Sequence, residues 1–144
     1  MIKKIFLWVI VPLILIQFIK IDIIEDKKID KTLEIQAPKK VLTILKKSCY
    51  DCHSYQTKVP WYGSIAPFSW EVKGHIKDAR NWLNFQEWAK YNEDKKQLFY
   101  KGIYKTVGKS MPIPMYLTMH KEAKLSKEEQ ATLKEWAITV FFIS

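Results

Sequence analysis

Two cysteines and a histidine stand together in the segment SCYDCHS, residues 48–54. Cys49 and Cys52 are the two cysteines of the chain, and His53 follows the second directly. Thiols one helical turn apart can each add to one vinyl group of a haem, and the adjacent imidazole can then bind the iron. The pattern C-x-x-C-H is therefore typical of c-type haem attachment, and it predicts one covalently bound haem c per chain.

Three other kinds of site use cysteines at this spacing. A thioredoxin-like redox pair also has C-x-x-C, but it needs a βαβ surround, which the sequence does not indicate. A disulfide between Cys49 and Cys52 would close a very short loop and stabilise the fold little. A zinc site could combine both thiols with two of His53, His75 and His120, but the chain has no second ligand pair at finger spacing. Haem attachment is the favoured interpretation.

An electron-carrying haem needs a second axial ligand opposite His53. The available candidates are Met111, Met115, Met119, His75 and His120. Met111 is favoured because it stands in a turn-rich segment between Gly108 and Pro112, which could fold over the haem edge. A single methionine is more often core filler, and a lone histidine more often has a surface or structural role. His75 is the second choice.

The N-terminal segment has the layout of a membrane anchor. Lys3 and Lys4 precede an uncharged apolar run over residues 5–19, and residues 1–36 hold no Ala, Gly, Ser or Cys that a signal peptidase could accept. As a helix, the run would extend about 22 Å, and flanking isoleucines could lengthen it toward the roughly 30 Å of a bilayer core. We therefore expect a single-pass inner-membrane protein whose soluble domain lies in the periplasm. The predicted division is a membrane anchor over 1–24, a charged tether over 25–37 and a haem-binding domain over 38–144.

The remaining elements are all predicted to be helical. Apolar residues recur at helical spacing after Pro38, in residues 69–83 and in residues 94–107, where Gly108 marks the end. Asn84 and Glu87 predict the start of a short helix, and a capping box of Ser126 and Glu129 opens the last one. No strand pattern or repeat is convincing. The predicted fold class is all-α, a cytochrome c-like helical domain around one haem.

Three segments together resemble a known family. They are CYDCHSYQTKVPWYGSIAPFSW, GHIKDARNWLNFQEW and MPIPMYLTMHKEAKLS. Over about residues 38–138, the chain resembles the haem-binding domain family of small c-type cytochrome-like proteins. The resemblance implies covalent haem at Cys49 and Cys52 with His53 as the proximal ligand. It also directs attention to Met111, through its Met-Pro pair, and to His75, within the Gly-His-Ile segment.

Composition and charge limit the possible partners. The 144 residues carry 24 basic and 15 acidic side chains, a formal charge of +9, but no nucleic-acid-binding motif. Lysines around an exposed haem edge could steer an acidic redox partner. The predicted function is one-electron transfer by a membrane-anchored monohaem c-type cytochrome in the periplasm. The alternative is a peroxidase-like haem enzyme, or a gas or redox sensor, with an open or displaceable sixth ligand; the absence of an evident acid–base pair makes the enzyme less favoured.

Overall fold

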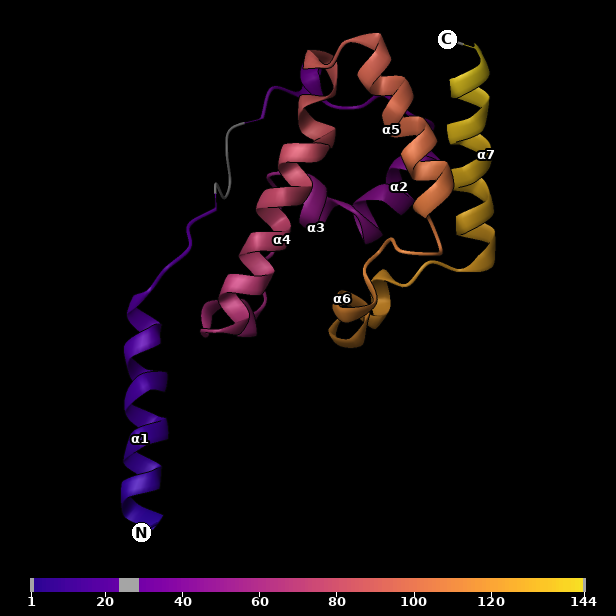
Figure 1. Cartoon of the computed structure of the whole chain (residues 1–144). Helices are drawn as coiled ribbons and strands as arrows, with labels where there is room; N and C mark the ends of the chain where they lie inside the picture. Colours follow the sequence, from indigo (N-terminus) through magenta and orange to yellow (C-terminus); the bar gives the residue numbers. More distant parts are fainter. Residues whose placement is uncertain (1, 24–28, 144) are drawn as a thin grey trace.

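The computed structural model describes residues 2–23 and 29–143, and within them every regular element is helical (Figure 1). The all-α prediction is therefore confirmed for the described residues, whose only β-pairing is an isolated bridge between Val107 and Met111. The α-helices are α1 (Ile2–Leu15), α2 (Lys39–Ser48), α3 (Tyr50–His53), α4 (Phe68–Trp82), α5 (Glu93–Thr106), α6 (Pro114–Met119) and α7 (Lys127–Ile143). Short 3-10 helices are η1 (Ile16–Phe18), η2 (Lys31–Leu33), η3 (Trp61–Ser64), η4 (Phe85–Lys90) and η5 (Lys121–Ala123).

The core lies where α2, α5 and α7 meet. Helices α5 and α7 run side by side in opposite directions, with α2 against them (Figure 1). Each helix contributes apolar side chains at helical spacing, and Leu45, Phe99 and Leu133 are almost completely buried. Ile35, which precedes α2, is buried in the same cluster and donates its backbone N–H to the Phe85 carbonyl over 2.8 Å. The segment that leads into α2 is thus part of the packed structure.

Capping residues fix the helix ends as the sequence predicts. The Ser126 hydroxyl accepts the Glu129 N–H, and the Glu129 carboxylate accepts the Ser126 N–H, which completes the capping box before α7. The Asn84 side chain accepts the Gln86 N–H at the start of η4. Gly108, with φ of +74°, ends the turn after α5.

The N-terminal helix corrects the predicted location. Helix α1 has 14 residues, which gives it a length of about 21 Å, and the chain leaves the helical path after Phe18. No helix within residues 2–23 and 29–143 is long and apolar enough to cross a membrane. The prediction of a single-pass inner-membrane protein with a periplasmic domain is therefore wrong, because the apolar run is divided between a short α-helix that ends at Leu15 and a 3-10 helix over Ile16–Phe18.

Contacts with the rest of the molecule hold the end of this apolar run. The Gln17 side chain accepts the backbone N–H of Ala66 over 2.9 Å and donates to the Ala66 carbonyl over 3.0 Å. The Trp70 indole N–H donates to the Ile19 carbonyl over 2.8 Å. The end of the apolar run is therefore hydrogen-bonded to the loop before α4 and to the first turn of α4. Of the predicted tether over 25–37, residues 25–28 lie outside the described residues.

Candidate functional site

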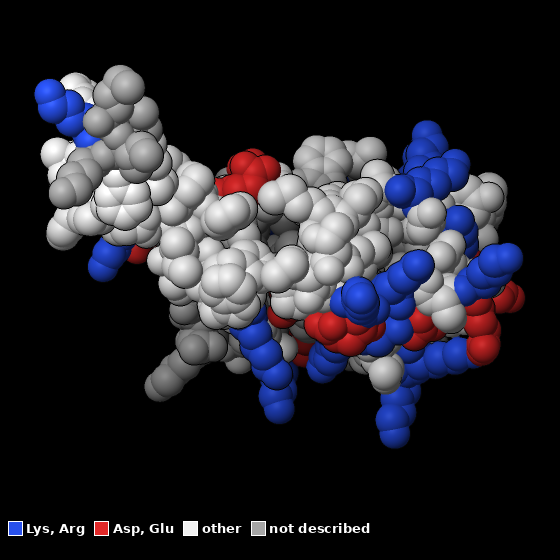
Figure 2. All heavy atoms as spheres, turned by 90° about the horizontal axis from the view of Figure 1, so that it is seen from below, with Lys and Arg blue, Asp and Glu red and all other residues white. Residues whose placement is uncertain are grey.

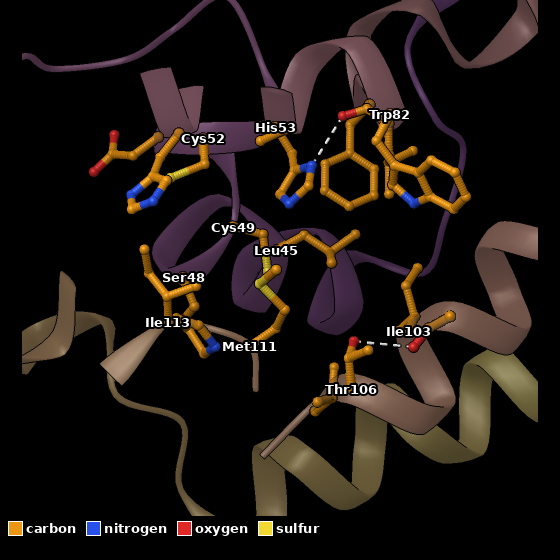
Figure 3. A pocket seen from close by; sticks show the side chains of 18 of the residues that line it. Leu45, Ser48, Cys49, Cys52, His53, Trp82, Ile103, Thr106, Met111 and Ile113 are labelled. Atoms are coloured by element: carbon orange, nitrogen blue, oxygen red, sulfur yellow. Dashed lines mark hydrogen bonds between the residues drawn. The ribbon is translucent and has the colours of Figure 1, made fainter. Parts of the chain in front are cut away.

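A cavity of about 380 Å³ opens between α3, α4, the second half of α5 and the segment before α6 (Figure 3). Its walls are largely apolar, and the sulfur and imidazole groups singled out in the sequence lie among them. All five residues in the predicted ligand set line it: Cys49, Cys52, His53, Met111 and the alternative His75. The fold thus brings Cys49 and Met111, which are 62 positions apart in the chain, to one site.

Helix α3 presents the two thiols. Cys49 lies at the junction of α2 and α3, and Cys52 lies in α3, where both cysteines are free. Burial raises the pKa of the Cys49 thiol to about 12 and that of the Cys52 thiol to about 11. A redox-active C-x-x-C pair depends on a lowered thiol pKa. Neutral, partly buried thiols beside an apolar cavity therefore argue against the thioredoxin-like alternative.

The imidazole of His53 is held in one tautomer. Its Nδ1 lies 2.9 Å from the carbonyl oxygen of Leu83. A carbonyl can only accept, so Nδ1 carries the proton and Nε2 keeps its lone pair. Burial lowers the pKa of His53, which favours the neutral ring, and Phe85 packs edge-on against it with ring centroids 5.9 Å apart. The ring projects into the cavity (Figure 3), so Nε2 is available as a metal ligand.

Met111 enters the cavity from the side opposite His53 (Figure 3). A tight turn holds its backbone at both ends: its N–H donates to the Thr106 carbonyl over 3.1 Å, and its carbonyl accepts the Gly108 N–H over 3.0 Å. The residue is 38% exposed. The turn thus fixes where the thioether starts while leaving the side chain room to move.

His75 lines the same cavity from α4 but is already paired. Its Nε2 lies 3.1 Å from a carboxylate oxygen of Glu71, one turn earlier, and the side chain is nearly half exposed. To bind a metal through that nitrogen, His75 would have to leave Glu71. The geometry therefore favours Met111 over His75 as the ligand opposite His53.

The other ligand candidates lie elsewhere. Met115 and Met119 line a second, adjoining cavity of about 520 Å³ between η3, α4 and α6. His120 donates or accepts a hydrogen bond of 2.9 Å with the Tyr62 hydroxyl and stacks on Tyr116 at 4.3 Å between ring centroids. Within the described part of the chain, no three His, Cys, Asp or Glu side chains form a group that could hold a metal ion, which leaves the zinc alternative without a ligand set there.

A hydrogen bond that the sequence did not indicate joins the two sides of the site. The Tyr116 hydroxyl of α6 donates to a carboxylate oxygen of Asp51 over 2.6 Å. Asp51 lies between the two cysteines, and Tyr116 lies on the helix that follows Met111. Both residues line both cavities. The contact therefore ties the Met111 segment to the helix that carries the thiols.

One face of the molecule carries few charged side chains (Figure 2). Seen from the end where η3 and α6 lie, the surface is mostly uncharged and hollowed, while lysines stand at its margins, partly interleaved with acidic side chains (Figure 2). Large apolar side chains on η3, α4 and α6 are well exposed, among them Trp61, Phe68 and Met119.

Comparison with protein families decides the kind of site. The model of a family described as the haem-binding domain matches residues 11–139, about nine-tenths of the chain. The chain belongs to the haem-binding domain family. No curated protein and no solved structure matches it. The match begins inside the apolar N-terminal run, ahead of the segments in which the resemblance is visible by eye.

The cavity fits the haem that this haem-binding domain implies. A haem needs an apolar pocket, an axial nitrogen or sulfur ligand, and, for covalent attachment, two thiols within reach. The structure brings a neutral imidazole, two partly buried thiols and a thioether to one largely apolar cavity. The hydroxyl of Ser48 also lines the cavity, is buried and has no partner among the described residues, so it is free to bond to a polar atom of a ligand.

Sequence reasoning missed the groups that position the ligands. The Leu83 carbonyl, which orients His53, is a backbone atom and has no signature in the sequence. Asp51 and Tyr116 carry only a weak signal, because their pairing joins positions 65 residues apart. Asp51 stands inside the C-x-x-C-H motif, which is the one feature that could have drawn attention to it.

Proposed function

We propose that the protein is a one-electron carrier, a c-type cytochrome with one covalently attached haem. Cys49 and Cys52 form the thioether links, and His53 binds the iron through Nε2. The single observation that carries this proposal is the hydrogen bond from His53 to the Leu83 carbonyl, beside two free thiols in an apolar cavity. This bond leaves the histidine neutral with its lone pair available, as an axial ligand requires.

A bound haem would supply an iron that accepts one electron from a donor protein and passes it to an acceptor. The chain's own residues then have three tasks. His53 and Met111 set the coordination, the apolar walls exclude water and lower the local dielectric, and the Leu83 carbonyl fixes the imidazole. We infer that the partner is acidic, because the chain carries a formal charge of +9.

Met111 is proposed as the sixth ligand. The turn from Thr106 to Met111 holds its backbone, it lies opposite His53, and its thioether has no hydrogen bond within the part of the chain that the structure describes. His75 is the alternative, and its ion pair with Glu71 opposes it. A thioether ligand favours the reduced iron and raises the reduction potential relative to a second histidine.

The test is the optical spectrum of the full chain produced in a host that attaches haem c. We expect the haem absorbance to stay with the polypeptide after denaturation, and Cys49→Ala with Cys52→Ala to abolish this. The oxidised protein should show the near-infrared band of a thioether–iron bond, which Met111→Ala removes and the control Met115→Ala retains. Haem that separates from the denatured chain would refute covalent attachment. A band unchanged in Met111→Ala would refute the sixth ligand.

A second candidate function is a haem sensor or peroxidase-like enzyme with a displaceable sixth ligand. The observation in its favour is the 38% exposure of Met111, which leaves its side of the cavity accessible. Carbon monoxide binding to the reduced protein separates the two functions. Slow or weak binding supports the electron carrier, and rapid, tight binding supports the sensor or enzyme.

A further inference from the structure

The peptide group between Leu83 and Asn84 is hydrogen-bonded at both of its polar atoms. Its carbonyl oxygen, from Leu83, accepts the Nδ1–H of His53 over 2.9 Å. Its N–H, from Asn84, donates to the hydroxyl oxygen of Tyr91 over 2.9 Å. One amide plane therefore connects a tyrosine hydroxyl directly to the imidazole of the C-x-x-C-H motif.

Neighbouring contacts prevent this peptide from turning. The Leu83 N–H caps α4 by donating to the Ala79 carbonyl over 2.8 Å, and the Phe85 carbonyl accepts the Ile35 N–H over 2.8 Å. Leu83 and Asn84 are both buried, at 5% and 0% exposure. The neighbouring bonds and the burial therefore hold the peptide with its carbonyl toward His53.

Aromatic and cationic contacts hold the ring of Tyr91. It packs edge-on against Phe99, with ring centroids 4.9 Å apart, and against Trp88 at 6.3 Å. The ammonium group of Lys95 lies 4.8 Å from the centre of the ring. These contacts direct the hydroxyl toward the Asn84 N–H. Tyr91 itself is not among the residues that line the cavity.

We propose that Tyr91 is a positioning residue for His53 that acts through the Leu83–Asn84 peptide. An amide whose N–H is engaged has a more negative carbonyl oxygen, because hydrogen bonds in a chain polarise one another. That oxygen accepts the Nδ1–H more strongly, which increases the electron density at Nε2. Tyr91 therefore both holds the imidazole in place and makes it a better donor to a bound metal. This inference rests on the proposed role of His53 as the proximal ligand.

The test compares Tyr91→Phe with Tyr100→Phe in the haem-loaded full chain. Tyr100 lies in the same aromatic cluster, also against Trp88, and its hydroxyl makes no hydrogen bond within the described residues. We expect Tyr91→Phe to raise the reduction potential, because a weaker imidazole donor stabilises the oxidised iron less, and to lower the iron–histidine stretching frequency. Tyr100→Phe should leave both unchanged. Equal values in the two variants would overturn the proposal.

A second measurement does not depend on haem. In the haem-free full chain, amide exchange at Asn84 should be about fivefold faster in Tyr91→Phe than in Tyr100→Phe, as loss of one hydrogen bond of about 1 kcal/mol predicts. If Tyr91→Phe does not fold, as judged by circular dichroism, replacement of Tyr91 by 3-fluorotyrosine keeps the shape and weakens the acceptor. The same rise in potential, but smaller, is then expected, and no change would refute the proposal.

His53→Ala separates this inference from the proposed function. If the variant keeps the axial-ligand spectrum of the wild type, His53 is not the ligand and the proposed function fails. If that spectrum is lost in His53→Ala while Tyr91→Phe matches Tyr100→Phe, only the role of Tyr91 fails.

Discussion

Gly108→Ala is expected to destabilise the protein and displace Met111. The backbone of Gly108 has φ of +74°, in the left-handed region, where an L side chain costs about 1–2 kcal/mol. An alanine Cβ would also collide with the side-chain amide of Gln130 on α7. If Gln130 moves away, it loses its 3.2 Å hydrogen bond to the Leu125 carbonyl, a further loss of about 1 kcal/mol. The sum is about 2–3 kcal/mol of unfolding free energy.

Urea unfolding of the full chain measures this loss, which corresponds to a midpoint lower by roughly 1–2 M for a typical dependence on denaturant. Gly74→Ala is the matched control. Gly74 lies inside α4, and a Cβ there meets nothing within 4 Å, so alanine should stabilise the protein by about 0.5–1 kcal/mol. The two substitutions are therefore expected to have opposite signs.

The same substitution reports on the ligand turn. The Gly108 N–H donates to the Met111 carbonyl, so a shift at position 108 moves the thioether. In the haem-loaded protein, the near-infrared thioether–iron band should weaken in Gly108→Ala and persist in Gly74→Ala. If Gly108→Ala is within about 0.5 kcal/mol of the wild type, the reasoning about its backbone is refuted.

Three further predictions test other contacts. Tyr116→Phe removes the hydrogen bond to Asp51, which is worth about 1.5–3 kcal/mol for a charged acceptor, and should increase proteolysis within residues 111–119. The control is Tyr104→Phe at an exposed tyrosine, and equal cleavage in the two variants would contradict the prediction. The hydrogen bond from Lys47, and to a smaller extent the one from the Ser126 N–H, lowers the pKa of Glu129 in the folded protein. The stability that the ionised Glu129 contributes is therefore present above the unfolded pKa of about 4.3, and it is lost as the pH falls through the lower folded pKa. Urea unfolding between pH 7 and pH 3 should therefore show a smaller decrease in unfolding free energy for Glu129→Gln than for the wild type. Glu135→Gln is the control, and a decrease equal to that of the wild type in both variants would refute the assignment. Arg80→Lys keeps the charge but loses the planar guanidinium, whose Nε donates to the Ser54 carbonyl and whose Nη2 donates to the Thr57 hydroxyl, so we expect the free energy of unfolding to fall by about 1–2 kcal/mol. Wild-type stability in thermal or urea unfolding would count against a structural role for the guanidinium.

Local signals in the sequence predicted the helices well. Helix caps involve residues that are close together in the sequence, so a short stretch of sequence is enough to predict them. This holds for the capping box of Ser126 and Glu129, the Asn84 cap and Gly108. The C-x-x-C-H motif is equally local. These features therefore predicted where α5, η4 and α7 begin or end, and the motif named three of the residues that line the cavity.

Contacts between distant segments were not predictable in the same way. The His53 imidazole is oriented by a carbonyl 30 positions away, and any residue could supply that atom. The membrane span was wrong for a related reason. Hydropathy shows that residues 5–19 are apolar, but it does not show that the helix ends at Leu15 and that Gln17 bonds to the backbone of Ala66.

The bonds between Gln17 and Ala66 affect how the protein should be produced. A shortened chain starting after the apolar run, the usual choice for recombinant expression, would leave the N–H and carbonyl of Ala66 without their partner. The Trp70 indole would lose the Ile19 carbonyl in the same cut. These groups border the second cavity, since Ile65 and Phe68 line it. Residues 17–19 should therefore be retained when the haem-binding domain is expressed, and a start at residue 17 is the shortest that keeps all three bonds.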